Sequence, residues 1–444
     1  MEILMGRITT DNCELLSKDF IDPAYLKEMQ LCKLQEIVRH AYNNVTLFRS
    51  RMDKLKLKPC DIKTLKDIAK LPFMKKTDLR DTYPFGLLAV PQSEIVRLHA
   101  SSGTTGKPIV VAYTQDDIEV WNEVMYRGLA GAGLNKNDII QVSYGYGLFT
   151  GGLGAHYGAE KLGATVVPAS GGNTRRQVML IRDFGVTALM CTPSYFIHVI
   201  EEAKKQGIDL RELPIKAGIF GAEPWTAGMR ERIEQGAGIE AFDIYGLSEI
   251  IGPGVAMECR NHNGLHIYED HFYPEIIDPD TGDVLPDGET GELVLTTLSK
   301  YAMPMIRYRT RDLTRIISEP CKCGRTIRRI DRISARSDDM FIIRGVNVFP
   351  SQIESALLAI EGTTPNYRII LYTENGMDNI QVDAELRPDM ISSDCEKMEK
   401  IRKKISASIE SITGLRVKLK LVDPNTIPPS EGKAKRVFDE RTAQ

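Results

Sequence analysis

Short apolar runs alternate with longer, helix-forming stretches from about residue 137 onward, and this alternation restricts the fold more than any other feature. The runs span residues 139–142, 165–168, 186–191 and 215–220. Strands that are each followed by a helix favour an α/β architecture with a largely parallel sheet, because parallel neighbours need a crossover connection. Before this region, Leu34, Ile37, Val38 and Ala41 repeat at helical spacing. We therefore predict that the first part of the chain is mainly helical.

The last hundred or so residues have a different pattern, which indicates a smaller α+β domain. Residues 368–372 and 380–386 are strand-like and flank Asn375-Gly376, a strong hairpin signal. A helix follows, and its apolar face is formed by Met398, Ile401, Ile405, Ile409 and Ile412. We predict a large N-terminal domain of residues 1–336 with mostly parallel sheets flanked by helices. Residues 337–444 would form the small C-terminal domain.

Composition excludes some classes of partner. The chain has 444 residues, a net charge of −3 and 26% charged residues, so no basic excess suggests a nucleic acid. An uncharged apolar run of about twenty residues, as a membrane span requires, does not occur in the sequence. The first residues do not resemble a signal peptide, and the 8 cysteines are too scattered for a disulfide framework. We expect a cytoplasmic protein without a membrane or nucleic-acid partner.

The most informative motif is Ser101-Ser102-Gly103-Thr104-Thr105-Gly106-Lys107-Pro108. Two glycines allow the backbone N–H groups to turn toward one concavity, where they bind anions, and Lys107 adds positive charge. The glycines are too close together for a Walker A loop, and Pro108 follows the lysine where that motif has Ser or Thr. Taken alone, the segment could equally be a plain surface turn.

Four further motifs follow in order. Tyr245-Gly246-Leu247-Ser248-Glu249 ends in a carboxylate that suits Mg²⁺. Asp312 follows a predicted strand and could accept hydrogen bonds from ribose hydroxyls, and Arg336 lies at the predicted domain boundary. Near the end of the chain, Lys433 lies in a Gly-containing loop after two prolines. Each motif is weak by itself, but the order and spacing of the set are specific.

Together these motifs resemble those of the adenylate-forming superfamily, which includes acyl-CoA synthetases, nonribosomal adenylation domains and luciferases. The resemblance extends from about Leu98 to Arg436. Residues 144–152, 264–277 and 336–350 are more specifically similar to the phenylacetate–CoA ligase family. The resemblance implies a two-step reaction. A carboxylate and ATP form an acyl-adenylate and pyrophosphate, and the thiol of coenzyme A then displaces AMP.

The resemblance also implies a role for each motif. Ser101, Ser102, Gly103, Thr104, Thr105, Gly106 and Lys107 would hold the β- and γ-phosphates, and Glu249 would hold Mg²⁺. The adenine site would be lined by Gly221, Ala222, Glu223, Pro224, Tyr245 and Gly246. Asp312 would bind the ribose, with Arg336 nearby. Lys433 would bridge the carboxylate and the α-phosphate. Two alternatives are open: Glu223 could simply cap a helix, and Lys435 is the nearest competitor of Lys433.

In this superfamily the C-terminal domain rotates between the two half-reactions. Asp338 matches the hinge, and Gly345 lies in the segment that would then face coenzyme A. The acyl pocket would be formed by two aromatic residues, Tyr144 and Phe149, and two small ones, Gly152 and Ala155. The alternative for Tyr144 and Phe149 is an ordinary place in the core.

A possible metal site lies in an insert at about residues 259–323. Cys321 and Cys323 form a Cys-x-Cys turn, and Cys259 and His266 would complete a closed Cys3His site of the structural zinc type. His262 could replace His266 as the fourth ligand. Unligated, reduced cysteines are the alternative. His271 is expected to form a structural hydrogen bond and not to bind a metal.

Other functions are compatible with parts of this pattern. An adenylation enzyme could load a different aryl acid, such as indoleacetate or a benzoate, onto coenzyme A or a carrier-protein thiol. A zinc-stabilised interaction or nucleic-acid module would need a basic surface, whereas the net charge is −3. It would also leave the Gly-Lys loops unexplained. The family resemblance leads us to expect a homodimer and small-molecule substrates.

Overall fold

The computed structural model describes residues 17–101, 108–333, 335–336, 341–343, 346–360, 362–374, 377–391, 395–424, 426–427 and 436–441. The chain divides into two compact units. The first unit consists of Met1–Cys191, Arg211–Ala222 and Ile239–Arg332. The second unit consists of Thr192–Leu210, Glu223–Gly238 and Ile333–Gln444. The predicted domain boundary near Arg336 stays a prediction.

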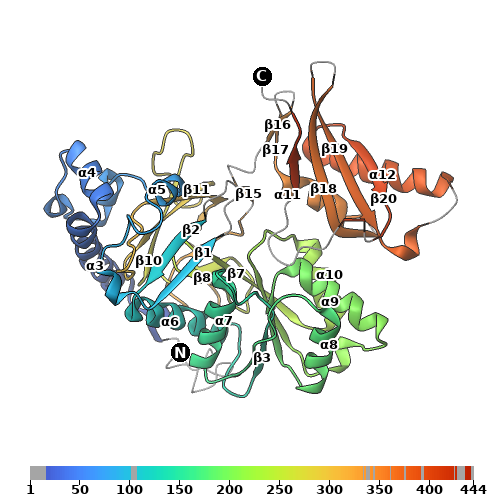
Figure 1. Ribbon diagram of the computed structural model, residues 1–444, viewed down its shortest axis with the longest axis horizontal. Helices are drawn as coiled ribbons and strands as arrows, with labels where there is room; N and C mark the ends of the chain where they lie inside the picture. Colours follow the sequence, from blue (N-terminus) through green and yellow to red (C-terminus); the bar gives the residue numbers. More distant parts are fainter. Residues whose placement is uncertain are drawn as a thin grey trace. The chain divides into compact units, whose positions relative to one another are not determined.

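A nine-stranded sheet forms the centre of the first unit, with the strand order β13-β14-β9-β8-β7-β6-β5-β3-β4 (Figure 1). Its parallel part consists of β3 (Ile139–Val142), β4 (Thr165–Val167), β5 (Ala188–Cys191), β6 (Ala217–Gly221) and β7 (Glu240–Leu247). Each of the four apolar runs that the sequence indicates overlaps one of the strands β3 to β6. Almost every residue of β5 and β6 is buried, as expected for strands covered on both faces.

The rest of the sheet is antiparallel, which the strand–helix alternation did not indicate. This part contains β8 (Gly252–Glu258), β9 (Leu265–Ile267), β13 (Ile316–Ile317) and β14 (Arg329–Ile330). Only a short turn separates β7 from β8, so no crossover helix fits between them and the chain must reverse direction. A second sheet is also antiparallel in the order β10 (Phe272–Ile277), β11 (Gly291–Thr297), β12 (Tyr308–Thr314). The sheets are therefore more mixed than predicted.

Helices cover the first unit, and a short hairpin completes it. Helix α3 (Pro23–Asn44) buries the predicted face with Leu34, Ile37, Val38 and Ala41. The other helices are α4 (Thr46–Lys54), α5 (Lys76–Asp81), α6 (Gln115–Gly131), α7 (Thr150–Lys161) and α8 (Thr174–Asp183). Strands β1 (Arg97–Ser101) and β2 (Ile109–Tyr113) pair antiparallel. Figure 1 shows β2, α6 and α7 grouped around β7 and β8, and α6 and α7 pack on β8.

The second unit contains a four-stranded sheet in the order β20-β19-β18-β21. Its strands are β18 (Thr363–Glu374), β19 (Met377–Leu386), β20 (Lys418–Val422) and β21 (Val437–Asp439). Glu374 pairs with Met377, so the two strands are joined through the predicted Asn375-Gly376 pair, which itself lies outside the described residues. The unit also includes α9 (Pro193–Lys205), α10 (Ala227–Ala237), β15 (Ala335–Arg336), β16 (Phe341–Ile343), β17 (Val346–Val348), α11 (Pro350–Leu358) and α12 (Cys395–Thr413).

The predicted apolar face of α12 is correct except at its C-terminal end. Ile401, Ile405 and Ile409 belong to the core of the second unit. Ile412, in contrast, is 43% exposed. The helix ends one residue later, and Gly414 follows with a positive φ of 72°, so the chain turns away before Ile412 can reach the core.

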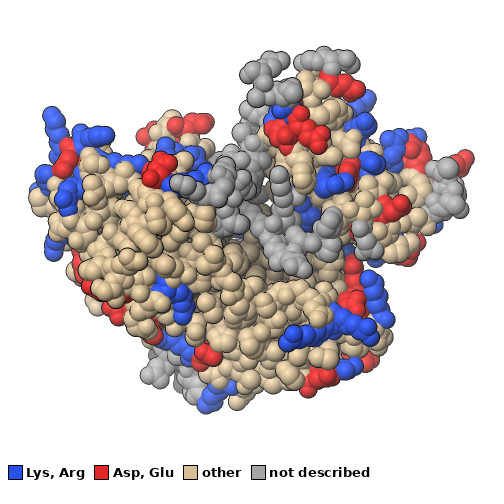
Figure 2. Space-filling model, in the orientation of Figure 1, with Lys and Arg blue, Asp and Glu red and all other residues tan. Residues whose placement is uncertain are grey.

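None of the described helices is both long and apolar enough to cross a lipid bilayer. Figure 2 shows basic and acidic side chains mixed on the face in view, as the net charge of −3 leads us to expect.

Candidate active site

A hydrogen bond links two of the predicted nucleotide-binding residues. The hydroxyl of Tyr245 donates to Oδ2 of Asp312 at 2.6 Å, and both side chains are buried. Tyr245 lies within β7 and Asp312 within β12, and not after strands as the sequence suggested. The strands are longer because β7 stays paired with β8 as far as Leu247 and β12 stays paired with β11 as far as Thr314.

Gly246 permits the close packing that extends β7. A Cβ at this position would lie 2.1 Å from the carbonyl oxygen of Gly252 on β8, so a larger residue would force the two strands apart. The motif therefore places Tyr245 in the strand and Glu249 in the turn directly after it.

Glu249 lies in the turn between β7 and β8 and is only 6% exposed. Its Oε1 atom is 3.6 Å from Nζ of Lys76, which lies at the start of α5 and has a side chain that is 43% exposed. This ammonium places a positive charge beside the buried carboxylate. Lys76 was not identified from the sequence, because it lies among many other lysines and has no motif of its own.

The predicted phosphate loop connects β1 to β2. Ser101 is the last residue of β1 and pairs with Ile109, the first residue of β2. Ser102, Gly103, Thr104, Thr105, Gly106 and Lys107 lie outside the described residues. The backbone N–H of Ala100 donates to the carbonyl of Leu148 at 2.9 Å. The end of β1 is thus attached to the segment predicted to bind the acyl group.

The predicted acyl segment has two aromatic side chains in different environments. Tyr144 is 7% exposed and its hydroxyl donates to the carbonyl of Cys191 at 2.7 Å. Phe149 is 43% exposed and precedes α7. Ala155 is fully buried, and a Cβ on Gly152 would lie 2.4 Å from the carbonyl oxygen of Gly145. Gly152 therefore allows α7 to pack directly against the backbone that follows Tyr144.

The predicted adenine segment begins at the end of β6. Gly221 is the last residue of that strand, and Ala222 has a φ of 70°, which is unusual for a residue with a side chain and typical of functional sites. Oε1 of Glu223 accepts a hydrogen bond from the backbone N–H of Ser194 at 2.8 Å, in the first turn of α9. Glu223 thus has the helix-capping contact that was its alternative. The adenine role of Gly221–Pro224 stays a prediction.

Three predicted residues, Asp338, Gly345 and Lys433, lie outside the described residues. Arg336 is in β15 of the second unit. The backbone that follows the Lys433 segment is well anchored, because Arg436 accepts a hydrogen bond from Ile369 at 2.8 Å and β21 pairs with β18.

The four predicted zinc ligands lie together. Their ligand atoms, in Cys259, His266, Cys321 and Cys323, are all within 4.8 Å of one another. Sγ of Cys259 is 3.7 Å from Sγ of Cys321, and Sγ of Cys323 is 3.4 Å from Nε2 of His266. Two thiolates bound to zinc at about 2.3 Å in a tetrahedral site lie roughly 3.8 Å apart. The side chains present therefore fit a zinc ion.

The pKa shifts of the cysteine thiols in this cluster also fit a metal site. Hydrogen bonds from Cys323 and His266 lower the pKa of the Cys259 thiol well below its ordinary value of 9.0. The pKa of Cys323 is raised by the same hydrogen bond and by burial. A thiolate stabilised by neighbouring protons is the form that a zinc ion would bind.

Two other histidines have different partners. His262, the alternative fourth ligand, lies with Nε2 3.1 Å from Glu240 and Nδ1 3.4 Å from Glu258, so the structure favours His266. His271 lies with Nε2 3.2 Å from Asp270. This second group of possible ligands, which includes Glu123, is filled by the guanidinium of Arg127, whose Nη1 is 2.8 Å from Asp270.

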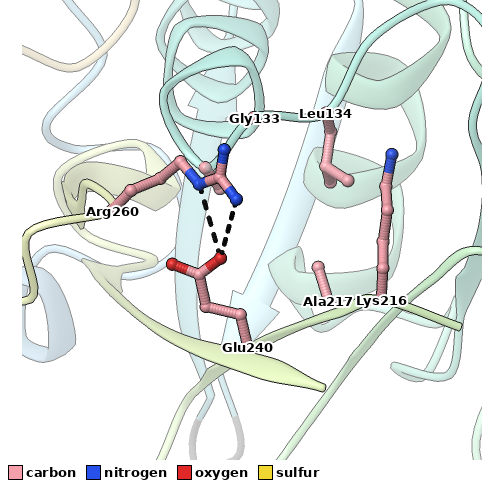
Figure 3. Close-up of a pocket in the computed structure, with 7 residues that line it drawn as sticks. Gly133, Leu134, Lys216, Ala217, Glu240 and Arg260 are labelled. Carbon is pink, nitrogen blue, oxygen red and sulfur yellow. Dashed lines mark hydrogen bonds and ion pairs between the residues drawn. The ribbon is translucent and has the colours of Figure 1, made fainter. Parts of the chain in front are cut away.

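A small pocket of about 160 Å³ is lined by Lys216, Glu240 and Arg260, among others. Figure 3 shows Arg260 directed at Glu240, to which it is hydrogen-bonded, with Lys216 set apart. Lys216 forms an ion pair with Asp138 at 2.6 Å. The cationic side chains of this pocket are thus already paired. The residues that line it include none of the predicted site residues.

Comparison with protein families identifies two regions. Residues 47–299 match the AMP-binding enzyme family, and residues 345–441 match the C-terminal domain of AMP-binding enzymes. A solved structure of 2-hydroxyisobutyryl-CoA ligase, in the postadenylation state and in complex with 2-HIB-AMP, superposes with a TM-score of 0.90 and 30% identity. The match covers 95% of this chain and 91% of that chain.

Two curated relatives are more similar in sequence. The phenylacetate–coenzyme A ligase of Pseudomonas putida is 54% identical over 419 residues, which are 94% of this chain and 95% of that protein. The phenylacetate–coenzyme A ligase of Escherichia coli strain K12 is 50% identical, over 95% of this chain and 97% of that protein. Identity at this level over nearly the whole length, with the Tyr245–Asp312 pair and the Glu249 turn in place, means that the chain belongs to the phenylacetate–coenzyme A ligase family of AMP-binding enzymes.

Proposed function

We propose that this chain joins phenylacetate, or a related aryl-acetate, to coenzyme A through an acyl-adenylate, with release of AMP and pyrophosphate. The observation that carries the proposal is the similarity to phenylacetate–coenzyme A ligases along nearly the whole chain. The arrangement of Tyr245, Asp312 and Glu249 in the first unit supports it, because these residues suit a nucleotide with a bound cation.

The first half-reaction needs charge neutralisation and positioning more than a protein nucleophile. A carboxylate oxygen of the acid attacks the α-phosphorus of ATP, and the bond to pyrophosphate breaks. Lys433 would contact both the carboxylate and the α-phosphate, and the loop from Ser101 to Lys107 would hold the phosphates that leave. Glu249 would hold Mg²⁺, which when bound neutralises phosphate charge. Lys76, whose Nζ is 3.6 Å from Oε1 of Glu249, would add positive charge beside that carboxylate.

The nucleoside part of ATP would be held by residues of the predicted ribose and adenine motifs. Asp312 would accept hydrogen bonds from the ribose hydroxyls through its carboxylate. Tyr245 would fix the orientation of that carboxylate, because its phenol already occupies Oδ2. Gly221, Ala222, Glu223 and Pro224 would line the adenine, and Arg336 would lie near the ribose.

In the second half-reaction, the thiol sulfur of coenzyme A attacks the acyl carbon and the bond to AMP breaks. The residues predicted to serve this step are Gly345, near coenzyme A, and Asp338, at the hinge. For the acid, Tyr144, Phe149, Gly152 and Ala155 would form the pocket.

We further propose that Cys259, His266, Cys321 and Cys323 bind one structural Zn²⁺. Four protein ligands leave no open position for a water or a substrate, so the ion would stabilise the fold and take no part in catalysis. The distances between the ligand atoms support this proposal. A homodimer and a cytoplasmic location stay predictions, and sedimentation of the purified protein would test the first.

The proposed function is tested by measuring pyrophosphate release from ATP and Mg²⁺ with a panel of carboxylic acids, each with and without coenzyme A. The expected result is release that depends on an aryl-acetate, with a thioester only when coenzyme A is present. Release with indoleacetate or a benzoate alone would move the assignment to that acid. Release with no acid in the panel would refute the proposed function.

A further inference from the structure

The turn that carries Glu249 is held by buried polar groups from two other elements. The N–H groups of Ile250 and Ile251 both donate to the carbonyl of Leu247, at 3.1 and 3.2 Å. These bonds leave the carbonyl groups of the turn to be satisfied from outside, because buried carbonyls rarely stay unpaired.

Lys300 satisfies one of these carbonyls. It follows β11 and is only 1% exposed, and its Nζ donates to the backbone oxygen of Glu249 at 3.0 Å. Burying a lysine is costly, and here burial lowers the pKa of Lys300 to about 8, against the attraction of Asp117 and Glu249. Such a residue needs specific partners to remain in the folded protein.

Tyr113 satisfies two more of these carbonyls. Its ring is fully buried at the end of β2, and its hydroxyl donates to the carbonyl of Ile251 at 3.1 Å and approaches that of Ser248 at 3.4 Å. The ammonium of Lys300 lies 5.0 Å from the centroid of the same ring, where a cation is attracted by the face of the ring. The two side chains therefore act on adjacent carbonyls of one turn.

Asp117 fixes the chain directly after Lys300. Its carboxylate accepts hydrogen bonds from the backbone N–H groups of Tyr301, at 2.7 Å, and Ala302, at 3.0 Å. Asp117 is itself fully buried at the start of α6. At the other end of the turn, the hydroxyls of Thr150 and Ser248 are 3.0 Å apart, which joins the turn to α7.

We propose that Lys300, supported by Tyr113, is the positioning residue that sets the orientation of the Glu249 carboxylate for binding Mg²⁺. This inference rests on the proposed function, because it takes Glu249 as the magnesium ligand. Lys300 does not touch the nucleotide in this scheme. It acts through the backbone of Glu249, so its removal should weaken magnesium-dependent binding specifically and leave other steps intact.

The test compares ATP binding to the full-length chain by calorimetry, in excess Mg²⁺ and in excess EDTA. The Kd in EDTA divided by the Kd in Mg²⁺ measures how much magnesium strengthens ATP binding. We expect Lys300→Met to lower this ratio by about tenfold, the effect of losing one buried, charge-assisted hydrogen bond. The Kd in EDTA should stay unchanged, as should thioester formation from supplied acyl-adenylate.

Lys33→Met is the matched control. Nζ of Lys33 also donates to a backbone carbonyl, that of Asp270 at 2.6 Å, and to Ser299 beside Lys300, but it does not contact the Glu249 turn. This variant should keep the wild-type ratio. If Lys300→Met fails to fold, Tyr113→Phe keeps the ring and removes only the hydroxyl, and it should lower the ratio by about threefold.

An unchanged ratio in a folded Lys300→Met protein, or an equal loss of affinity with Mg²⁺ and with EDTA, would overturn the inference. The same loss in Lys33→Met would overturn it too, since the effect would then be a general one of burying fewer charges. Wild-type protein that binds ATP equally well with and without Mg²⁺ and releases no pyrophosphate would instead refute the proposed function.

Discussion

The carboxylate of Asp312 has one oxygen occupied by the phenol of Tyr245 and is itself buried, so its position is fixed before a nucleotide binds. We predict that Asp312→Ala raises the KM for ATP by about 100-fold, because two hydrogen bonds from ribose hydroxyls to a charged group would be lost. The KM for phenylacetate should change little. Steady-state kinetics with each substrate varied in turn measures both constants.

Asp331→Ala is the control for this prediction. Asp331 is another aspartate of the first unit, but it is partly exposed and pairs with Arg315 at 2.9 Å. Exposed ion pairs of this kind contribute little, so the kinetics should be unchanged. An equal rise of both KM values in Asp312→Ala would contradict a ribose contact and indicate a general disturbance of the site.

At the scale of single residues, the sequence identified those in motifs and missed those defined only by burial. Tyr245, Glu249 and Asp312 were found because their order and spacing are specific. Lys76 and Lys300 were not, since nothing in the sequence distinguishes a lysine beside Glu249 from one on the surface. Their roles arise from contacts between segments that are more than fifty residues apart in the chain, as Lys300 is from Glu249.

At the scale of elements, the apolar runs predicted β3, β4, β5 and β6 because each is a short strand followed by a helix. The antiparallel strands β8 and β9 were not predicted, and neither was the antiparallel pairing of the second sheet. Their partners are decided by turn length and by contacts across the sheet, and periodicity within one strand does not encode these. The fourth zinc ligand shows the same limit, because the choice between His262 and His266 depended on which strand packs beside Cys321.

The zinc insert makes a prediction at this scale. We expect about one zinc per chain in purified protein, and Cys321→Ser should lose it and lower the Tm by about 5 °C or more, because metal binding contributes directly to folding. Mass spectrometry of the metal content and thermal denaturation measure the two effects. Cys60→Ser, at an exposed cysteine, should change neither. A zinc-free wild-type protein of full stability would contradict the site.

Helix α11 leads to a second prediction at the scale of elements, which concerns how the stability of the protein depends on pH. Burial raises the pKa of Glu354 to about 7, from an ordinary value of 4.5, against the attraction of Arg436. The folded protein therefore keeps this proton up to about pH 7, whereas the unfolded chain loses it near pH 4.5. The contribution of Glu354 to the free energy of unfolding is thus fully present below pH 4.5. It decreases by up to about 3 kcal/mol as the pH rises through about 7.

Glu354→Gln should remove this part of the pH dependence and stabilise the protein above pH 7. Urea denaturation at pH 5 and at pH 8 measures the difference. Glu399→Gln, on the exposed face of α12, is the matched control, because Glu399 pairs only with Arg402 in the part of the chain that is described. Stability of the wild type that rises between pH 5 and pH 8 by more than that of Glu354→Gln would contradict the sign of this prediction.

At the scale of the whole molecule, the two half-reactions attack different atoms, first the α-phosphorus of ATP and then the acyl carbon, so each would require its own groups. Lys433 is predicted for adenylation and Gly345 for thioester formation, and both belong to residues 337–444. One domain that turns about Asp338 would supply each in its turn. One single substitution should therefore slow only adenylation, and another should slow only thioester formation.

We predict that Lys433→Ala lowers adenylation by about 100-fold or more but leaves thioester formation from supplied acyl-adenylate largely intact. Lys435→Ala should affect neither step. Asp338→Pro should do the reverse, because a proline fixes φ and restricts the turn that brings Gly345 to coenzyme A. Asp338→Ala, which keeps the backbone free, is its control. Single-turnover measurements of each half-reaction separate the effects. If either Lys433→Ala or Asp338→Pro slowed both steps equally, a rotating domain would not explain how one chain performs the two reactions.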